Sequence, residues 1–82
     1  MQLSRIKDYF AAGAITGALV HYFPISGAWS VEFEFRPGTY PGGETGLDTQ
    51  RGKLREFKTA DSALRVLRDI GLERVTVLLP QK

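Results

Sequence analysis

Few side chains in this sequence could do chemistry. A single histidine, His21, could act as a general base or bind a metal ion, but the chain has no cysteine and no second histidine to share that work. The four serines have no acid–base pair beside them and no G-x-S-x-G turn, so nucleophilic catalysis has no support. We therefore expect no catalytic residue, no bound metal, no cofactor and no small-molecule substrate.

Glu32 and Glu34 stand two positions apart, so on an extended strand both carboxylates face the same side. Paired carboxylates can do general acid–base work. Because these two lie in a run that alternates apolar and polar residues, the simpler interpretation is that they are solvated side chains on a polar strand face. We also expect them to be the acidic counterpart to the basic hairpin around residues 51–55, within one molecule or across a dimer. The sequence favours binding over catalysis.

Positive charge is concentrated in one region. Residues 1–50 carry three basic and five acidic side chains, whereas residues 51–68 carry six basic side chains against two acidic ones. The six are Arg51, Lys53, Arg55, Lys58, Arg65 and Arg68. Such a patch could neutralise phosphates and give salt-sensitive affinity for DNA or RNA. The spacing of Asp61, Arg65 and Asp69 equally suits salt bridges on a solvated helix, and no base-reading helix is evident.

The elements that must position these residues are arranged around residues 29–36. This run alternates apolar and polar side chains, which predicts a central strand with one buried and one wet face. An amphipathic helix over residues 3–12 and a strand over residues 15–23 precede it. Residues 24–28 then form a hairpin connection that places the two strands side by side.

A second hairpin is expected in the middle of the chain. It follows a Pro/Gly-rich loop over residues 37–43, whose role the sequence leaves open. The predicted strands are residues 47–50 and 54–57, around Arg51-Gly52-Lys53. A two-residue turn would set Asp48 opposite Arg55, and a three-residue turn would set it opposite Glu56. We favour the first register because it pairs opposite charges.

Residues 60–70 show helical period, with Thr59 as the N-cap and Gly71 as a left-handed stop. A short β-branched strand over residues 75–79 follows and ends at Pro80. The order is therefore helix, four strands, helix, strand. It predicts one α+β domain over residues 1–82, a two-layer sandwich in which both helices cover one face of a mainly antiparallel sheet of about five strands.

Three segments resemble the small partition-associated proteins of the ParC family, which plasmids and integrative elements of proteobacteria carry. They are residues 12–18, residues 27–29 and, above all, Arg51–Ala63 leading to Leu67–Gly71. The resemblance implies a cytoplasmic, non-enzymatic accessory factor in the maintenance of a mobile element. It transfers no catalytic or binding residue to this chain.

The function expected from the sequence is binding. A small core, one open sheet face and free strand edges suit a protein partner or self-association, and DNA binding through the basic region is the alternative. A small inhibitor of a host defence system is a third, because mobile elements encode many small proteins without enzymatic signatures. We expect no membrane span: residues 9–31 carry no formal charge, but Pro24 and three glycines interrupt them.

Overall fold

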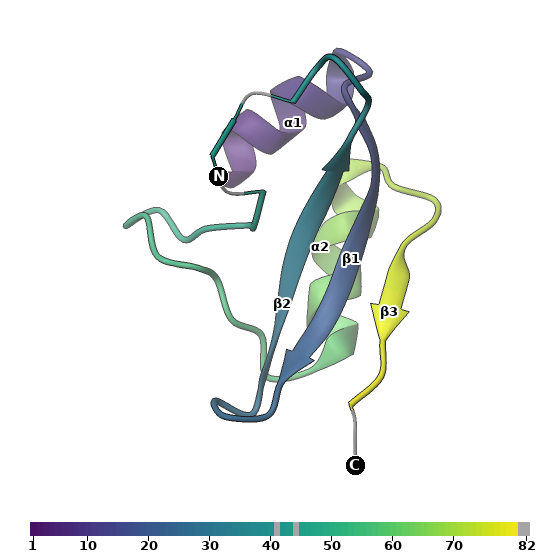
Figure 1. Ribbon diagram of the computed structural model, residues 1–82. Helices are drawn as coiled ribbons and strands as arrows, with labels where there is room; N and C mark the ends of the chain where they lie inside the picture. The colour runs from purple at the N-terminus through teal and green to yellow at the C-terminus, as the bar shows by residue number, and fades with distance from the viewer. Residues whose placement is uncertain (41, 44, 81–82) are drawn as a thin grey trace.

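The computed structural model describes residues 1–40, 42–43 and 45–80. Within these residues the elements are helix α1 (Leu3–Ala11), strand β1 (Ile15–Phe23), strand β2 (Ala28–Phe35), helix α2 (Ala60–Ile70) and strand β3 (Thr76–Leu78). The strand order is β2-β1-β3, with β2 antiparallel and β3 parallel to β1. Helix α2 crosses behind the sheet, and α1 lies near the end where β1 begins (Figure 1).

The predicted hairpin of β1 and β2 is confirmed. Its register sets Val20 opposite Val31 and Ala18 opposite Phe33, and these four side chains are buried. The register shifts once, between Ile15 and Gly17. Because strand residues alternate between faces, this register fixes which side chains of the two strands point away from the core.

Helix α2 begins and ends as its sequence predicts. The Thr59 hydroxyl oxygen accepts a hydrogen bond from the Ser62 N–H at 3.1 Å, which satisfies one of the free donors of the first turn. At the other end Gly71 has φ 119°, a left-handed conformation, and its N–H donates to the Leu67 and Arg68 carbonyls. A Cβ at Gly71 would also meet the Phe10 ring at 2.9 Å, so glycine lets α1 approach this turn.

Both helices contribute to one hydrophobic core. Ile6 of α1 and Leu67 of α2 are buried in the same cluster as the inward-facing residues of β1 and β2. The buried members of this cluster are Ile6, Ile15, Ala18, Val20, Val31, Phe33, Leu47, Phe57, Ala63 and Leu67. Neither helix in the described part of the chain is long and apolar enough to cross a membrane.

The second hairpin forms only in part. The Arg55 N–H donates to the Leu47 carbonyl at 2.8 Å and the Thr49 N–H donates to the Lys53 carbonyl at 2.6 Å, but the predicted strands over residues 47–50 and 54–57 do not form. The Leu47 N–H donates to the Val31 carbonyl at 2.9 Å, and Phe57 exchanges hydrogen bonds with Trp29, so the segment touches the outer edge of β2 at two places. Only one residue of β2, Ser30, lies between Val31 and Trp29, so a continuous neighbouring strand would need one residue between Leu47 and Phe57. The chain instead has nine, residues 48–56, which loop out from the sheet. Apolar Leu47 and Phe57 are buried as anchors, while the polar residues between them leave the sheet.

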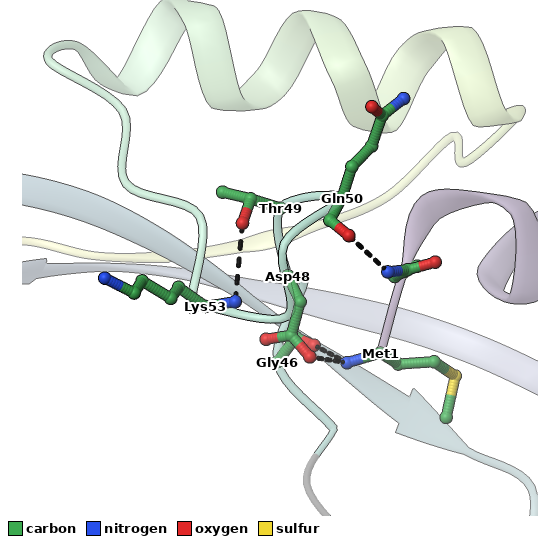
Figure 2. A network of polar contacts seen from close by, with 7 residues as sticks. Met1, Gly46, Asp48, Thr49, Gln50 and Lys53 are labelled. Carbon is green, nitrogen blue, oxygen red and sulfur yellow. Dashed lines mark hydrogen bonds and ion pairs between the residues drawn. The ribbon is translucent and has the colours of Figure 1, made fainter.

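The favoured register of this hairpin was also wrong. Asp48 forms an isolated bridge with Leu54, not with Arg55 or Glu56. Its carboxylate accepts a hydrogen bond from the amino group of Met1, which also donates to the Gly46 carbonyl at 2.7 Å (Figure 2). Nearby, the Gln2 side-chain amide donates to the Gln50 carbonyl at 2.9 Å. Residues 48–56, called the excursion below, are thus held by the segment that leads into α1. The sequence pattern could not reveal this contact.

The predicted five-stranded, mainly antiparallel sheet is therefore corrected to a mixed sheet of three strands in the described residues. The α+β class is loosely compatible with two helices and this small sheet. Because α2 carries the chain across to the far side of β1, β3 returns parallel to β1. Of the predicted loop over residues 37–43, residue 41 lies outside the described residues; in the rest, the Thr39 hydroxyl donates to the Arg36 carbonyl at 2.6 Å.

Candidate protein-interaction surface

The basic residues predicted as a patch lie on two separate parts of the surface. Arg65 and Arg68 are exposed on α2 and line one depression together with Asp61 and Leu64. Arg51 and Lys53 are exposed on the excursion, and Lys58 is exposed just before α2. The structure thus brings Arg65 and Arg68 together and leaves the turn residues on a different element.

Two expectations about these charges are corrected. The ion pairs found in the described part of the chain join the Met1 amino group to Asp48 and His21 to Glu32, so Arg65 has no salt bridge there with Asp61 or Asp69. Arg55 is half-buried, and its guanidinium carbon lies 4.8 Å from the centre of the Phe57 ring, a cation–π distance. Arg55 therefore packs on Phe57 of its own chain, whereas the other five predicted basic residues are exposed.

Glu32 and Glu34 lie on the sheet face opposite α2. Both are exposed and alternate with buried Val31 and Phe33, as the sequence predicts. In the described residues neither carboxylate forms an ion pair with the basic hairpin, and the whole sheet separates both from the basic residues of α2. The carboxylate of Glu32 instead lies 3.6 Å from the Nε2 atom of His21.

His21, Ser30 and Glu32 meet on this face, a juxtaposition that the sequence pattern did not reveal. The Ser30 hydroxyl lies 3.1 Å from His21 Nε2, the same ring nitrogen that faces Glu32. A serine–histidine–acid catalytic group uses one ring nitrogen for the serine and the other for the acid. Here both partners share Nε2, and Ser30 is fully buried. This geometry orients the imidazole and presents no accessible nucleophile at Ser30.

The face that α2 does not cover is named the open face here. Strand alternation and the register assign to it Leu19, His21, Phe23, Ser30, Glu32, Glu34, Thr76 and Leu78. Phe23 is 36% exposed and Leu78 is 50% exposed, and the Phe23 ring packs edge-on against His21 with centroids 4.6 Å apart. Large apolar side chains therefore reach solvent on the open face beside carboxylates.

Leu54 extends the open face beyond β2. Gly46 forms an isolated antiparallel β-bridge with Glu32. The Leu54 side chain packs over Gly46 and leaves no room for a larger residue, because a Cβ there would lie only 2.9 Å from it. Leu54 is 41% exposed. Leu54, which was predicted to lie in a hairpin strand, thus adds an apolar side chain to the open face.

A hollow of about 640 Å³ lies at one end of the open face. It is lined by Thr16, Gly17, Ala18, Glu34, Glu73, Arg74, Val75 and Thr76. Gly17 has no side chain to fill it, and Glu34 lies against Gly17, with its Oε1 atom 3.3 Å from where a Cβ would stand. The walls of the hollow carry two carboxylates and one guanidinium.

Comparisons with known protein families, curated proteins and solved structures give no match. The residues of the open face must therefore carry the functional argument. One signal in the sequence could have located them: given the turn at residues 24–27, a period of two applied to β1 places Leu19, His21 and Phe23 beside Ser30 and Glu32.

Proposed function

We propose that this protein is a non-enzymatic binding protein that acts through protein–protein contacts made by the open face. The observation that carries the proposal is that Phe23, Leu54 and Leu78 are all partly exposed on the side of the sheet without helices. Exposed apolar patches bordered by polar residues mark interaction surfaces more often than inert ones.

The charges around these apolar side chains indicate the chemistry of the partner. Glu32 borders the apolar side chains, and the hollow at Gly17 is lined by Glu34, Glu73 and Arg74, so carboxylates outnumber the one cation. Complementary charge steers encounter and fixes the orientation of a complex. The open face therefore fits a partner segment that carries apolar side chains together with lysine or arginine.

Selection from a peptide library tests this proposal. We expect peptides selected on the unmodified protein to be rich in apolar and basic residues. They should bind the double variant Phe23→Ser, Leu54→Ser at least about tenfold more weakly, because each truncated contact in a binding centre costs about 1 kcal/mol or more. Isothermal titration measures the affinities.

A matched control changes the other side of the molecule. Arg65→Ala, Arg68→Ala alters two exposed residues of α2 and should leave peptide affinity within about twofold, because the sheet separates α2 from the open face. Circular dichroism checks that each variant is folded. Equal weakening by both double variants, or selected peptides that ignore the Phe23 and Leu54 changes, would contradict the proposal.

The cellular setting of the proposal comes from the resemblance to ParC-family proteins. In that setting the protein is a cytoplasmic accessory factor of a mobile genetic element that helps a plasmid to be partitioned or maintained. An inhibitor of a host defence system is the alternative role for the same binding surface. Genes for partition proteins beside this gene would support the first role, and a gene neighbourhood without mobile-element functions would count against both.

Nucleic-acid binding is a second candidate function, and exposed, unneutralised cations favour it. Arg51, Lys53, Lys58, Arg65 and Arg68 are all exposed, and none is in an ion pair within the described residues. Such side chains are free to contact phosphates. Arg55 is not counted with them, because it stacks on Phe57.

If this alternative holds, the protein should retard duplex DNA in gel-shift assays at low salt. Reversing two charges with Arg65→Glu, Arg68→Glu should then reduce the slope of log affinity against log salt by about two, since each phosphate contact contributes roughly 0.9. Lys7→Glu, an exposed change on α1, is the control. An unmodified protein that does not bind at low salt eliminates this candidate.

A further inference from the structure

The two edges of the sheet differ in how they are protected. The outer edge of β2 is covered by the chain itself: the Phe33 N–H donates to the Thr45 carbonyl at 2.9 Å, and Trp29 and Phe57 exchange hydrogen bonds at 2.7 and 2.8 Å. The other edge is β3, whose outer side has no bridge or backbone hydrogen bond to any described residue. One edge is therefore closed and the other is open, as Figure 1 also shows.

The open edge lacks most of the features that usually prevent strand pairing. Natural edge strands are protected by being very short, or by charged side chains, prolines or bulges. β3 is short, with three residues, but it carries none of the other protections. Residues 75–79 read Val-Thr-Val-Leu-Leu, without a charge or a proline, and Pro80 follows only after them. Leu79 is 73% exposed. An apolar, uncharged edge of this kind is suited to pairing with another strand.

Strand alternation identifies which backbone groups of β3 are free. Trp29, Val31 and Phe33 direct their hydrogen bonds outward, so Ser30 and Glu32 direct theirs to β1. Their partners on β1 are His21 and Leu19, which leaves Val20 facing β3. In a parallel pair, Val20 then bonds the residues on either side of its counterpart, Val77. The N–H and C=O of Val77 consequently point away from the sheet.

We propose that β3 pairs with β3 of a second copy of this chain, antiparallel and around a two-fold axis at Val77. In this register Val77 of one copy faces Val77 of the other, and Val75 faces Leu79, so the outward backbone groups of both strands are satisfied. Pro80 has no outward N–H to lose in this arrangement. Two three-stranded sheets would join into one.

The sequence of the edge favours a second copy as the occupant. The paired residues are all β-branched or leucine, and the first charges, Arg74 and Glu73, lie beyond them, so no like charges meet. The short edge limits the interface to less than the roughly 1,200 Å² typical of stable complexes. The dimer is therefore concentration-dependent. It uses the backbone groups at the edge of β3, whereas the proposed function uses side chains of the open face, so this inference and the proposed function can fail separately.

Disulfide trapping tests the register directly, because the chain has no cysteine of its own. Thr76 of one copy faces Leu78 of the other as a non-hydrogen-bonded pair, with Cα atoms about 4.5 Å apart, within disulfide range. The two copies of Thr76, and likewise the two copies of Leu78, lie diagonally across the pair, about 7 to 8 Å apart, which is too far for a disulfide. Mild oxidation of an equimolar mixture of Thr76→Cys and Leu78→Cys should give mainly the mixed disulfide dimer. A statistical mixture of the three possible dimers would overturn the proposal.

Two further variants separate edge pairing from binding by the open face. Leu79→Pro removes an outward N–H at an exposed position, so it should weaken dimerisation about tenfold to a hundredfold in sedimentation equilibrium while leaving peptide binding intact. Phe23→Ser should do the reverse. A dimer unaffected by Leu79→Pro, or a protein that stays monomeric at millimolar concentration, would refute edge pairing.

Discussion

Replacing Phe33 by alanine is expected to lower the free energy of unfolding by about 3 to 5 kcal/mol. Phe33 is 3% exposed and belongs to the core cluster that Ile6 of α1 and Leu67 of α2 share. Removing its ring leaves a cavity in the core that both helices share. The strands cannot move to fill this cavity, because their pairing holds Phe33 opposite Ala18. A domain of this size has roughly 5 to 15 kcal/mol in total, so the variant should be largely unfolded or close to it.

The control for this prediction is Phe23→Ala, the same chemical change on the open face. Phe23 is partly exposed and lies outside the core cluster, so its truncation should cost less than about 1 kcal/mol. Urea unfolding followed by far-ultraviolet circular dichroism measures both variants. A Phe33→Ala protein as stable as the Phe23→Ala protein would show that the two faces of β2 have been assigned in reverse.

Local signals in the sequence predicted the parts of the fold that depend on neighbouring residues. The alternation of residues 29–36 identified Val31 and Phe33 as buried, and the turn after β1 paired it with β2. Thr59 and Gly71 identified the ends of α2, because a helix cap is formed by residues within one turn. Each of these signals comes from residues only a few positions apart in the sequence.

The segment over residues 47–57 could not be predicted in the same way. The turn residues Arg51-Gly52-Lys53 suggested two paired strands, but Leu47 and Phe57 are each held by β2 and Asp48 by the amino group of Met1, 47 positions away. Such distant contacts override strand propensity. The overestimate of the number of strands follows from this single segment.

The candidate interaction surface was predicted only in part. Period-two alternation correctly placed Glu32 and Glu34 in solvent, and the basic residues other than Arg55 are exposed as expected. Which side of the molecule each occupies depends on how α2 crosses the sheet, and no local pattern encodes that crossing. Likewise His21, taken alone, gave no sign of its contacts with Ser30 and Glu32, because those contacts require the register of β1 against β2.

An anchor of the excursion yields the second large effect: Leu47→Ala should lower the free energy of unfolding by about 2 to 5 kcal/mol. Leu47 is fully buried, although it lies outside the helices and strands. Its backbone also bonds Val31, so its side chain anchors the segment that covers the edge of β2. Leu54→Ala, in the excursion itself but partly exposed, should cost less than about 1 kcal/mol and serves as the control.

Hydrogen exchange distinguishes loss of this cover from general destabilisation. The amides of Trp29 and Phe33 bond the covering segment, whereas Ser30 and Glu32 face β1. If Leu47 holds the cover in place, Leu47→Ala should accelerate exchange at Trp29 and Phe33 more than at Ser30 and Glu32, because the outer edge opens before the hairpin does. Equal acceleration at all four amides would mean that Leu47 supports the core as a whole and that the edge of β2 stays closed until the domain unfolds.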